Sequence, residues 1–172
     1  MSYDNCLDFS RSLLGIKYRW WKEGDSDDLF YCNGIPSIEI LNRDGINCAG
    51  FVNILRQYSG LSIPESNVYR GGTRFWYNYF SENTKLNKFD PEESYPNGTL
   101  LLRDYRNIED QGHLSVIIDA NLTDTLEGTI IHAYADLDVG EVGLTKLRYS
   151  HYYIDSGYYE YAILPEDWLS SN

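Results

Sequence analysis

Two hydrophobic patterns occupy different halves of the chain, and their order restricts the fold more than any other feature. In the N-terminal half, apolar residues recur at helical spacing, most clearly at Cys48, Phe51, Val52, Leu55 and Tyr58. The C-terminal half instead carries β-rich runs between turn-forming residues. The predicted strands are residues 100–103, 114–119, 129–134 and 158–164, with 138–147 as a further candidate. Helices followed by an antiparallel sheet are typical of an α+β domain.

The whole chain, residues 1–172, is predicted to form one domain. Of its 172 residues 42% are hydrophobic, which is enough to bury a core without disulfides or a metal ion. Besides the helix at 48–58, helices are predicted at 2–14 and 73–80. Residues 22–46 are predicted to be a loop-rich insertion.

Cys48 opens the predicted central helix, and this position suits a nucleophile. Asn47, directly before it, is a typical N-cap residue. The unpaired N–H groups and the positive end of the helix dipole favour the thiolate over the thiol. The same N–H groups can bind a developing oxyanion. Considered alone, a cysteine on an apolar helix face is more often a small buried hydrophobic residue, so its function depends on its neighbours.

Two histidines in strand-like runs are candidates to activate Cys48. His113 opens one run and His132 lies in the next. Neighbouring antiparallel strands would hold both imidazoles on one face of the sheet. His113 would then be the general base for the thiol, and His132 would orient His113 through a hydrogen bond between the rings. The alternative is that each histidine is a partly buried residue with a structural role.

Four short motifs, in their order along the chain, resemble the NlpC/P60 family of papain-like cysteine peptidases. The motifs are Tyr18-Arg19-Trp20-Trp21, Asn47-Cys48-Ala49-Gly50, His113-Leu114-Ser115-Val116 and Ile131-His132-Ala133. Two further stretches, 58–64 and 95–101, resemble the family's segments after the nucleophile helix and before the first strand. The resemblance covers roughly residues 12–133.

This resemblance implies a papain-like fold in which N-terminal helices, including the nucleophile helix, pack on an antiparallel sheet. It also implies a hydrolase of the thiol protease type that cuts a peptide or glycopeptide of the bacterial cell wall, peptidoglycan. The implied catalytic triad is Cys48, His113 and His132. Tyr18 is implied as a hydroxyl donor near the thiol, and Ala49 and Trp20 are expected in the oxyanion and substrate-binding region.

Three departures from the family pattern keep other functions open. Asn47 and Ala49 replace an aspartate and a serine, Trp21 and Lys22 replace two glycines, and the segment 22–46 is long for the family. The same thiol chemistry would serve an amidase, an acyltransferase or a protease directed at proteins. A different alternative is a catalytically silent member of the fold that binds a peptide or protein.

The acidic composition argues against two classes of partner. The chain has 14 Lys and Arg against 26 Asp and Glu, a net charge of −12, so neither nucleic acid nor an anionic membrane is expected as a partner. Its three cysteines and three histidines lack the short spacings of a zinc site, and no metal or other cofactor is expected. Without a recognisable secretion signal or membrane-spanning run, the protein is expected to be cytoplasmic as made, with release by lysis or a non-classical route as the alternative.

Overall fold

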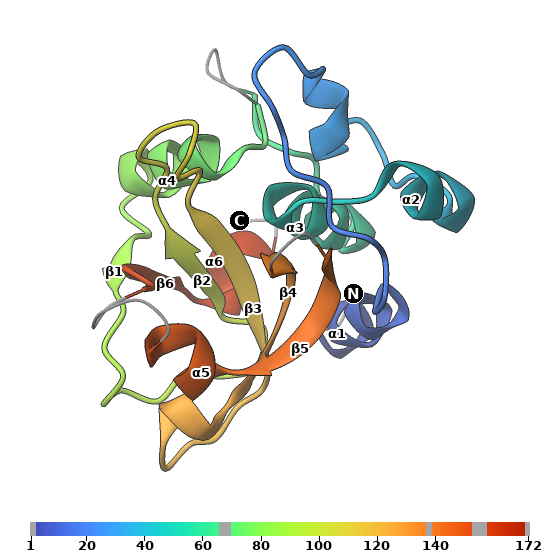
Figure 1. Ribbon diagram of the computed structural model, residues 1–172. Coiled ribbons are helices and arrows are strands. Elements are labelled where there is room, and N and C mark those ends of the chain that lie inside the picture. The colour runs from blue at the N-terminus through green and yellow to red at the C-terminus, as the bar shows by residue number, and fades with distance from the viewer. Residues whose placement is uncertain (1–2, 66–69, 137–138, 153–157, 171–172) are drawn as a thin grey trace.

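The strand-type runs of the second half pair into one sheet. The computed structural model describes residues 3–65, 70–136, 139–152 and 158–170, and six strands lie within these ranges (Figure 1). They are β1 (Asn87–Lys88), β2 (Leu100–Arg103), β3 (His113–Asp119), β4 (Thr129–Asp136), β5 (Val139–Lys146) and β6 (Tyr161–Ile163). Neighbouring strands are antiparallel in the order β1-β6-β2-β3-β4-β5. The predicted α+β class with an antiparallel sheet is confirmed.

Three helices follow the sequence prediction closely. They are α1 (Tyr3–Ser12), α3 (Cys48–Tyr58) and α4 (Thr73–Glu82). The predicted start of the first helix at residue 2, and the predicted start of the fifth strand at residue 138, lie outside the described residues. The strand predicted at 158–164 is shorter than expected: β6 begins only at Tyr161, and Leu164 is already the N-cap of α6 (Pro165–Trp168).

Several short helical segments escape the sequence prediction. They are η1 (Asp27–Phe30), α2 (Ile38–Asp44), η2 (Thr125–Glu127), α5 (Leu147–Tyr152) and α6. Two of them, η1 and α2, fall within residues 22–46, the segment predicted to be loop-rich. The Ser37 side chain accepts a hydrogen bond from the Ile40 N–H at 3.3 Å and begins α2, and Gly45 ends it with a φ of 77°.

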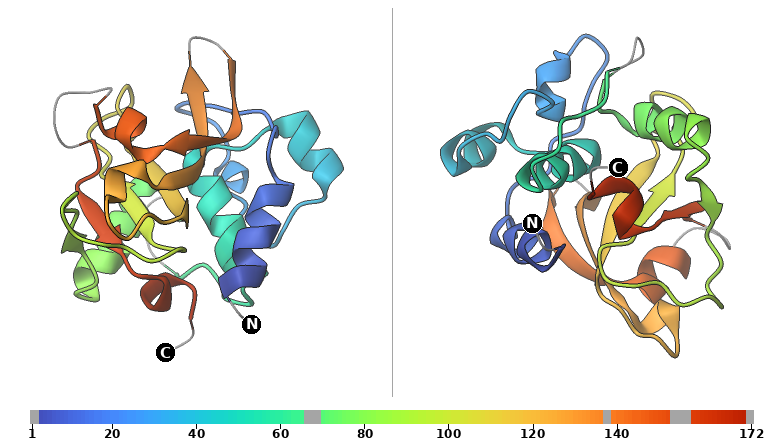
Figure 2. Two further views of the ribbon diagram at one scale, coloured as in Figure 1. Left: turned by 90° about the horizontal axis from the view of Figure 1, so that it is seen from below. Right: turned by 180° about the vertical axis from the view of Figure 1, so that it is seen from behind.

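Side-chain alternation gives the sheet two buried faces. On one face, residues of β3 and β4 such as Val116 and Ile131 pack against Phe51 of α3. On the other face, Ile117 of β3 packs with Leu147 of α5 in a separate cluster. The two views in Figure 2 show α1 beside α3. Both helices contribute buried side chains to the cluster on the first of these faces.

One buried amide joins three segments around the middle of α3. Asn53 is fully buried, and its Nδ2 donates to the carbonyl oxygens of Phe30 at 2.8 Å and Gly71 at 2.9 Å. Its Oδ1 accepts from Trp76 Nε1 at 2.7 Å. Buried polar groups are costly when unpaired, so these bonds fix how the segment after η1 and helix α4 approach α3.

A buried arginine ties α3 to α6. Arg56 Nη1 donates to the carbonyl oxygen of Trp168 at 2.6 Å, and its Nε donates to the carbonyl oxygen of Ser62 at 2.9 Å. The guanidinium lies 5.5 Å from the centre of the Trp76 ring. Trp168 Nε1 in turn donates to the carbonyl oxygen of Gly98 at 2.8 Å. Trp168 of α6 is therefore bonded through its backbone to α3 and through its side chain to the segment before β2.

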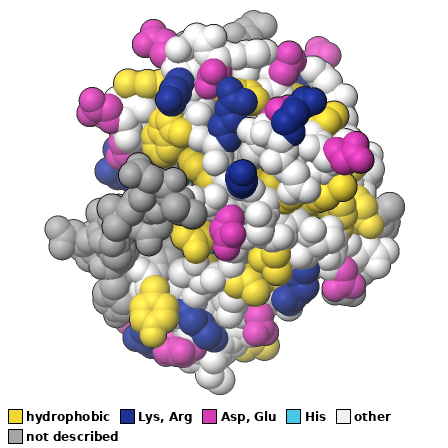
Figure 3. All heavy atoms as spheres, turned by 45° about the vertical axis from the view of Figure 1, so that its right-hand side comes forward, with side chains coloured by type: hydrophobic (Ala, Val, Ile, Leu, Met, Phe, Trp, Pro, Cys, Tyr) yellow, Lys and Arg dark blue, Asp and Glu magenta, His cyan; other side chains and the backbone are white. Residues whose placement is uncertain are grey.

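The face drawn in Figure 3 carries apolar, acidic and basic side chains. On the side where Figure 1 shows α1 and α2, Figure 3 shows apolar side chains divided by acidic and basic ones. Among the described helices, none is both long enough and apolar enough to cross a bilayer.

Candidate active site

Cys48 is the first residue of α3, and several polar groups surround its thiol. The Asn47 side chain caps the helix by accepting a hydrogen bond from the Gly50 N–H at 2.8 Å. Cys48 is only 7% exposed, but it lines a cavity. The backbone N–H of Leu114 and the hydroxyl of Thr73 both hydrogen-bond to its sulfur. The thiol therefore sits between the start of α3, the start of α4 and the first residues of β3.

Burial dominates the ionisation of this thiol. It raises the pKa of Cys48 above its usual value, and the hydrogen bonds from Leu114, Thr73 and the Ala49 N–H only partly lower it. The expectation that the helix start gives Cys48 a net preference for the thiolate is wrong for the free protein. The Cys48 side chain is therefore a neutral thiol at neutral pH.

The two histidines form the pair that the sequence predicts. His113 Nε2 lies 2.8 Å from His132 Nδ1, and His132 Nε2 lies 3.0 Å from the Thr145 hydroxyl oxygen. The Tyr134 ring stacks on His132 with the ring centres 4.6 Å apart. Gly143 makes this stack possible, because a Cβ at that position would lie 2.8 Å from the Tyr134 ring. The imidazole of His132 is thus held from three sides.

Both imidazoles are neutral at physiological pH. Burial lowers the pKa of His132 to about 4. The pKa of His113 is also well below its ordinary value, first because of burial and then because of the nearby His132 and the Arg103 guanidinium. The guanidinium of Arg103 also lies over the Tyr158 ring at 4.8 Å, which in turn lies 5.8 Å from the His113 ring. A neutral imidazole is the form that can accept a proton.

The histidine pair lies on the sheet face that carries α5. His113 contacts Tyr158 and Tyr159, and Tyr159 belongs to the same cluster as Ile117. The thiol comes nearest to this pair at the start of β3, where its sulfur contacts the N–H of Leu114, the residue bonded to His113. Within the part of the chain that the structure describes, no hydrogen bond joins the Cys48 thiol to a His113 nitrogen.

Tyr18 is placed near the thiol by backbone pairing. Its N–H donates to the Gly140 carbonyl oxygen at 2.7 Å, and the next N–H, of Arg19, donates to the carbonyl oxygen of Ile46 at 3.0 Å. Gly140 is required here, because a Cβ would lie 2.6 Å from the Tyr18 Cβ. Burial, with a further contribution from Cys48, raises the Tyr18 pKa far above its usual value. The Tyr18 hydroxyl therefore stays protonated and can donate a hydrogen bond.

The cavity beside Cys48 has a volume of about 380 Å³ and a largely aromatic and apolar wall. Its lining includes Tyr18, Trp21, Phe30, Asn47, Cys48, Ala49, Thr73, Arg74, Tyr105, Ile108 and Gln111. Ala49 thus lies where the sequence places it. Trp20 does not line this cavity: it is 39% exposed and borders a shallower depression with Arg19, whereas Trp21 faces the cavity and stacks near Phe30. In an extended segment neighbouring side chains point to opposite sides, which explains the exchange of the two tryptophans.

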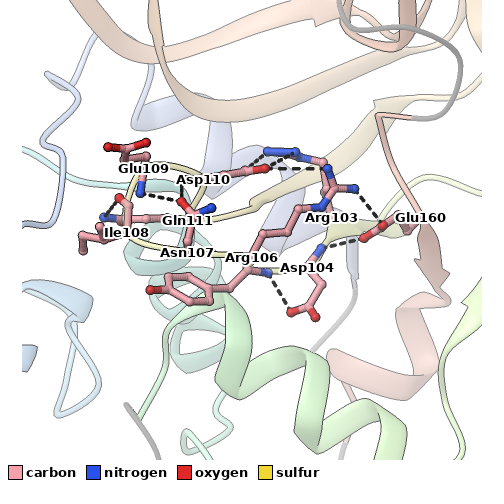
Figure 4. Close-up of polar contacts among 10 residues, drawn as sticks. Arg103, Asp104, Arg106, Asn107, Ile108, Glu109, Asp110, Gln111 and Glu160 are labelled. Carbon is pink, nitrogen blue, oxygen red and sulfur yellow. Dashed lines mark hydrogen bonds and ion pairs between the residues drawn. The ribbon is translucent and has the colours of Figure 1, made fainter.

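The loop between β2 and β3 forms one wall of this cavity, and ion pairs hold it in shape (Figure 4). Arg103 pairs with Asp110 across the base of the loop, and Arg106 pairs with Glu160 at 3.1 Å. Gln111 Nε2 then donates to the Trp21 carbonyl oxygen at 2.8 Å and joins this wall to the segment that carries Tyr18.

Gly112 connects the loop to His113. Its φ is 75°, and a Cβ there would lie 2.4 Å from the carbonyl oxygen of Arg103. Only glycine fits a left-handed backbone at such close approach. The residue before the candidate base is therefore fixed by sterics.

Sequence reasoning missed Thr73, Thr145 and Tyr158, each of which contacts a predicted site residue. Thr145 and Tyr158 belong to runs that the sequence predicts as strands. A polar residue within such a run was the sequence signal that could have indicated a role in the site. Among the described residues, no group of three or more His, Cys, Asp or Glu side chains is arranged to hold a metal ion.

Comparison of the chain with models of known protein families, with curated proteins and with solved structures finds no match.

Proposed function

We propose that this protein is a cysteine hydrolase that cleaves an amide bond through a thioester intermediate, on a papain-like fold of the NlpC/P60 type. The observation that carries the proposal is the contact between the Cys48 sulfur and the N–H of Leu114. It brings a helix-terminal thiol beside the start of β3, where His113 contacts His132 of β4, at the wall of a cavity. A nucleophile, a base and an orienting group are the parts that acyl transfer needs.

In the acylation step, the Cys48 sulfur attacks the carbonyl carbon of the substrate amide. The thiol proton passes to His113 Nδ1, and the carbonyl oxygen becomes an oxyanion. We expect the N–H groups at the start of α3, including that of Ala49, and the protonated Tyr18 hydroxyl to donate to this oxyanion. Protonated His113 then gives its proton to the leaving amine, which departs and leaves a thioester on Cys48.

In the deacylation step, water attacks the thioester carbonyl. His113 takes a proton from the water, a second oxyanion forms in the same place, and the thiolate leaves and recovers the proton. An amine in place of water would complete an acyl transfer by the same steps, so amidase and acyltransferase activities need no other residues.

The resting site contains a neutral thiol and a neutral imidazole, because burial disfavours both charged forms. Proton transfer is therefore expected to accompany attack on a bound substrate. Substrate that fills the cavity would also exclude water from the developing charges and strengthen their attraction.

The cavity favours a peptide as substrate. Aromatic and apolar side chains form most of its wall, which also includes Glu23, and its basic residue Arg74 is already paired with Asp104 at 2.7 Å. Such a wall suits uncharged parts of a peptide or glycopeptide. A cell-wall peptide is proposed on the family resemblance alone, and a protease directed at proteins is the alternative with the same chemistry.

A second candidate is a catalytically silent protein that binds a peptide in this cavity. Two observations favour it: burial raises the pKa of the Cys48 thiol, and the described residues show no hydrogen bond between that thiol and His113. Active sites in the free state often have such loose contacts, so this geometry does not decide between the two candidates.

Alkylation kinetics separate these candidates. The iodoacetamide reaction rates of Cys6, Cys32 and Cys48 are measured by peptide mass spectrometry across pH, in the wild type and in His113→Gln. Cys6 and Cys32 are buried thiols outside the cavity and serve as internal references. The hydrolase is expected to show a Cys48 that reacts faster than both references and slows when His113 is replaced. A Cys48 no faster than the references, and insensitive to that replacement, would support the silent protein.

Cleavage of a defined substrate tests the cell-wall assignment. The protein is incubated with muropeptides that contain D-Glu and diaminopimelate, with Cys48→Ala as control, and the products are identified by mass. Protein whose Cys48 passes the alkylation test but leaves these peptides intact would rule out the cell-wall substrate and leave the hydrolase open.

A further inference from the structure

The chain of hydrogen bonds behind His113 decides whether that residue can act as a base. His113 Nε2 contacts His132 Nδ1 at 2.8 Å, and His132 Nε2 contacts Thr145 Oγ1 at 3.0 Å. A neutral imidazole carries one proton, so one of its nitrogens donates and the other accepts. The direction of the first bond therefore fixes the direction of the second.

Two proton arrangements are consistent with this chain. In the first, the Thr145 oxygen accepts from His132 Nε2–H, His132 Nδ1 accepts from His113 Nε2–H, and His113 Nδ1 keeps a free lone pair. In the second, Thr145 O–H donates to His132 Nε2, His132 Nδ1–H donates to His113 Nε2, and His113 Nδ1 carries the proton. Only the first leaves His113 able to accept a proton from a thiol.

The structure favours the first arrangement. A separation of 3.0 Å is typical of N–H···O bonds, whereas a hydroxyl donor usually approaches its acceptor more closely. Thr145 is also partly exposed, so its own hydroxyl proton can be donated to water while its oxygen accepts. Its position is set by strand pairing: Gly143 lies opposite His132, and Thr145 lies two residues further along β5, on the same face.

We propose that Thr145 is a positioning residue that selects the tautomer of both histidines. By accepting the His132 Nε2–H it holds His113 in the Nε2–H form, with Nδ1 unprotonated. Among the described residues, none forms a hydrogen bond with His113 Nδ1, so no donor competes for its lone pair. Its use as a base rests on the proposed function, but the tautomer itself does not.

Nitrogen-15 NMR of the imidazole side chains tests the assignment directly. Long-range proton–nitrogen spectra at neutral pH distinguish a protonated from an unprotonated ring nitrogen, and are recorded for the wild type, Thr145→Val and Thr145→Ser. The valine variant keeps the branched shape but removes the acceptor, whereas serine retains the hydroxyl. We expect the Nε2–H form of His113 in the wild type and in the serine variant. Loss of one hydrogen bond should shift the tautomer ratio about tenfold toward Nδ1–H in the valine variant.

Two results would overturn the proposal: His113 protonated at Nδ1 in the wild type, or a tautomer ratio unchanged in Thr145→Val. The alkylation rate of Cys48 is measured in the same three proteins as a separate readout. A slower Cys48 in the valine variant, restored by serine, supports both the tautomer role and the hydrolase. The expected tautomers with a Cys48 alkylation rate that is equal in all three proteins support the role of Thr145 and refute the proposed function.

Discussion

The burial of the histidine pair makes the stability of this protein depend on pH in a defined direction. The pKa of His132 is about 4 in the folded protein, against 6.5 for an ordinary histidine. Between these values the unfolded chain binds more protons than the folded one. Stability is therefore complete above pH 6.5 and is lost as the pH falls toward 4.

The size of the effect follows from the same two values. A difference of about 2.5 pKa units corresponds to about 3 kcal/mol once titration is complete, at 1.36 kcal/mol per unit. At pH 5 about 2 kcal/mol of this is already lost relative to pH 7. His113 shifts in the same direction, so it adds to the loss.

Urea unfolding followed by tryptophan fluorescence at pH 7, 6 and 5 measures this effect. The matched control is His132→Gln, which keeps a hydrogen-bonding side chain but does not titrate. Carboxylates titrate in both proteins, so the difference between their pH slopes isolates the histidine. The wild type should lose about 2 kcal/mol more than the variant between pH 7 and pH 5. Equal slopes would refute the reasoning and would mean that the pair accepts a proton readily in the folded state.

Three substitutions test other parts of the structure. Asn53→Leu leaves three buried polar groups unpaired and should cost at least about 3 kcal/mol in urea unfolding, whereas exposed Asn42→Ala should cost almost nothing. Gly112→Ala forces a Cβ against a backbone carbonyl, so it should lower the free energy of unfolding by about 2 kcal/mol and should also slow Cys48 alkylation. An alkylation rate equal to that of the wild type would show that the position of His113 does not depend on this turn. Gly143→Ala displaces the Tyr134 ring, and a change in the imidazole NMR signals should report it; unchanged signals would contradict the stacking.

The sequence predicted the features that depend on strong local patterns. Helix α3 was predicted because its apolar residues recur at helical spacing, and strands β2 to β4 because β-rich runs stand between turn-forming residues. The contact between His113 and His132 followed from placing two neighbouring strands side by side.

Features that depend on tertiary packing were not predictable in this way. The pKa of Cys48 depends on how deeply the sheet and α4 bury it, and no local pattern reports that depth. The side to which Trp20 and Trp21 point depends on the pairing of their segment with β5. Helix α2 is different, because Ser37 and Gly45 are ordinary start and stop signals that the charged, irregular composition of residues 22–46 obscured.

The bond between Arg56 and the Trp168 carbonyl has a consequence for synthesis of the chain. The two residues are 112 positions apart. At about 5–20 residues per second, a ribosome needs roughly 6–20 s to make the chain between them. Throughout that interval α3 lacks its anchor on α6, and it lacks the sheet until strands β2 to β5 have been made. Until then the thiol at its start meets the solvent as an ordinary cysteine, and the catalytic environment that we propose assembles only afterwards.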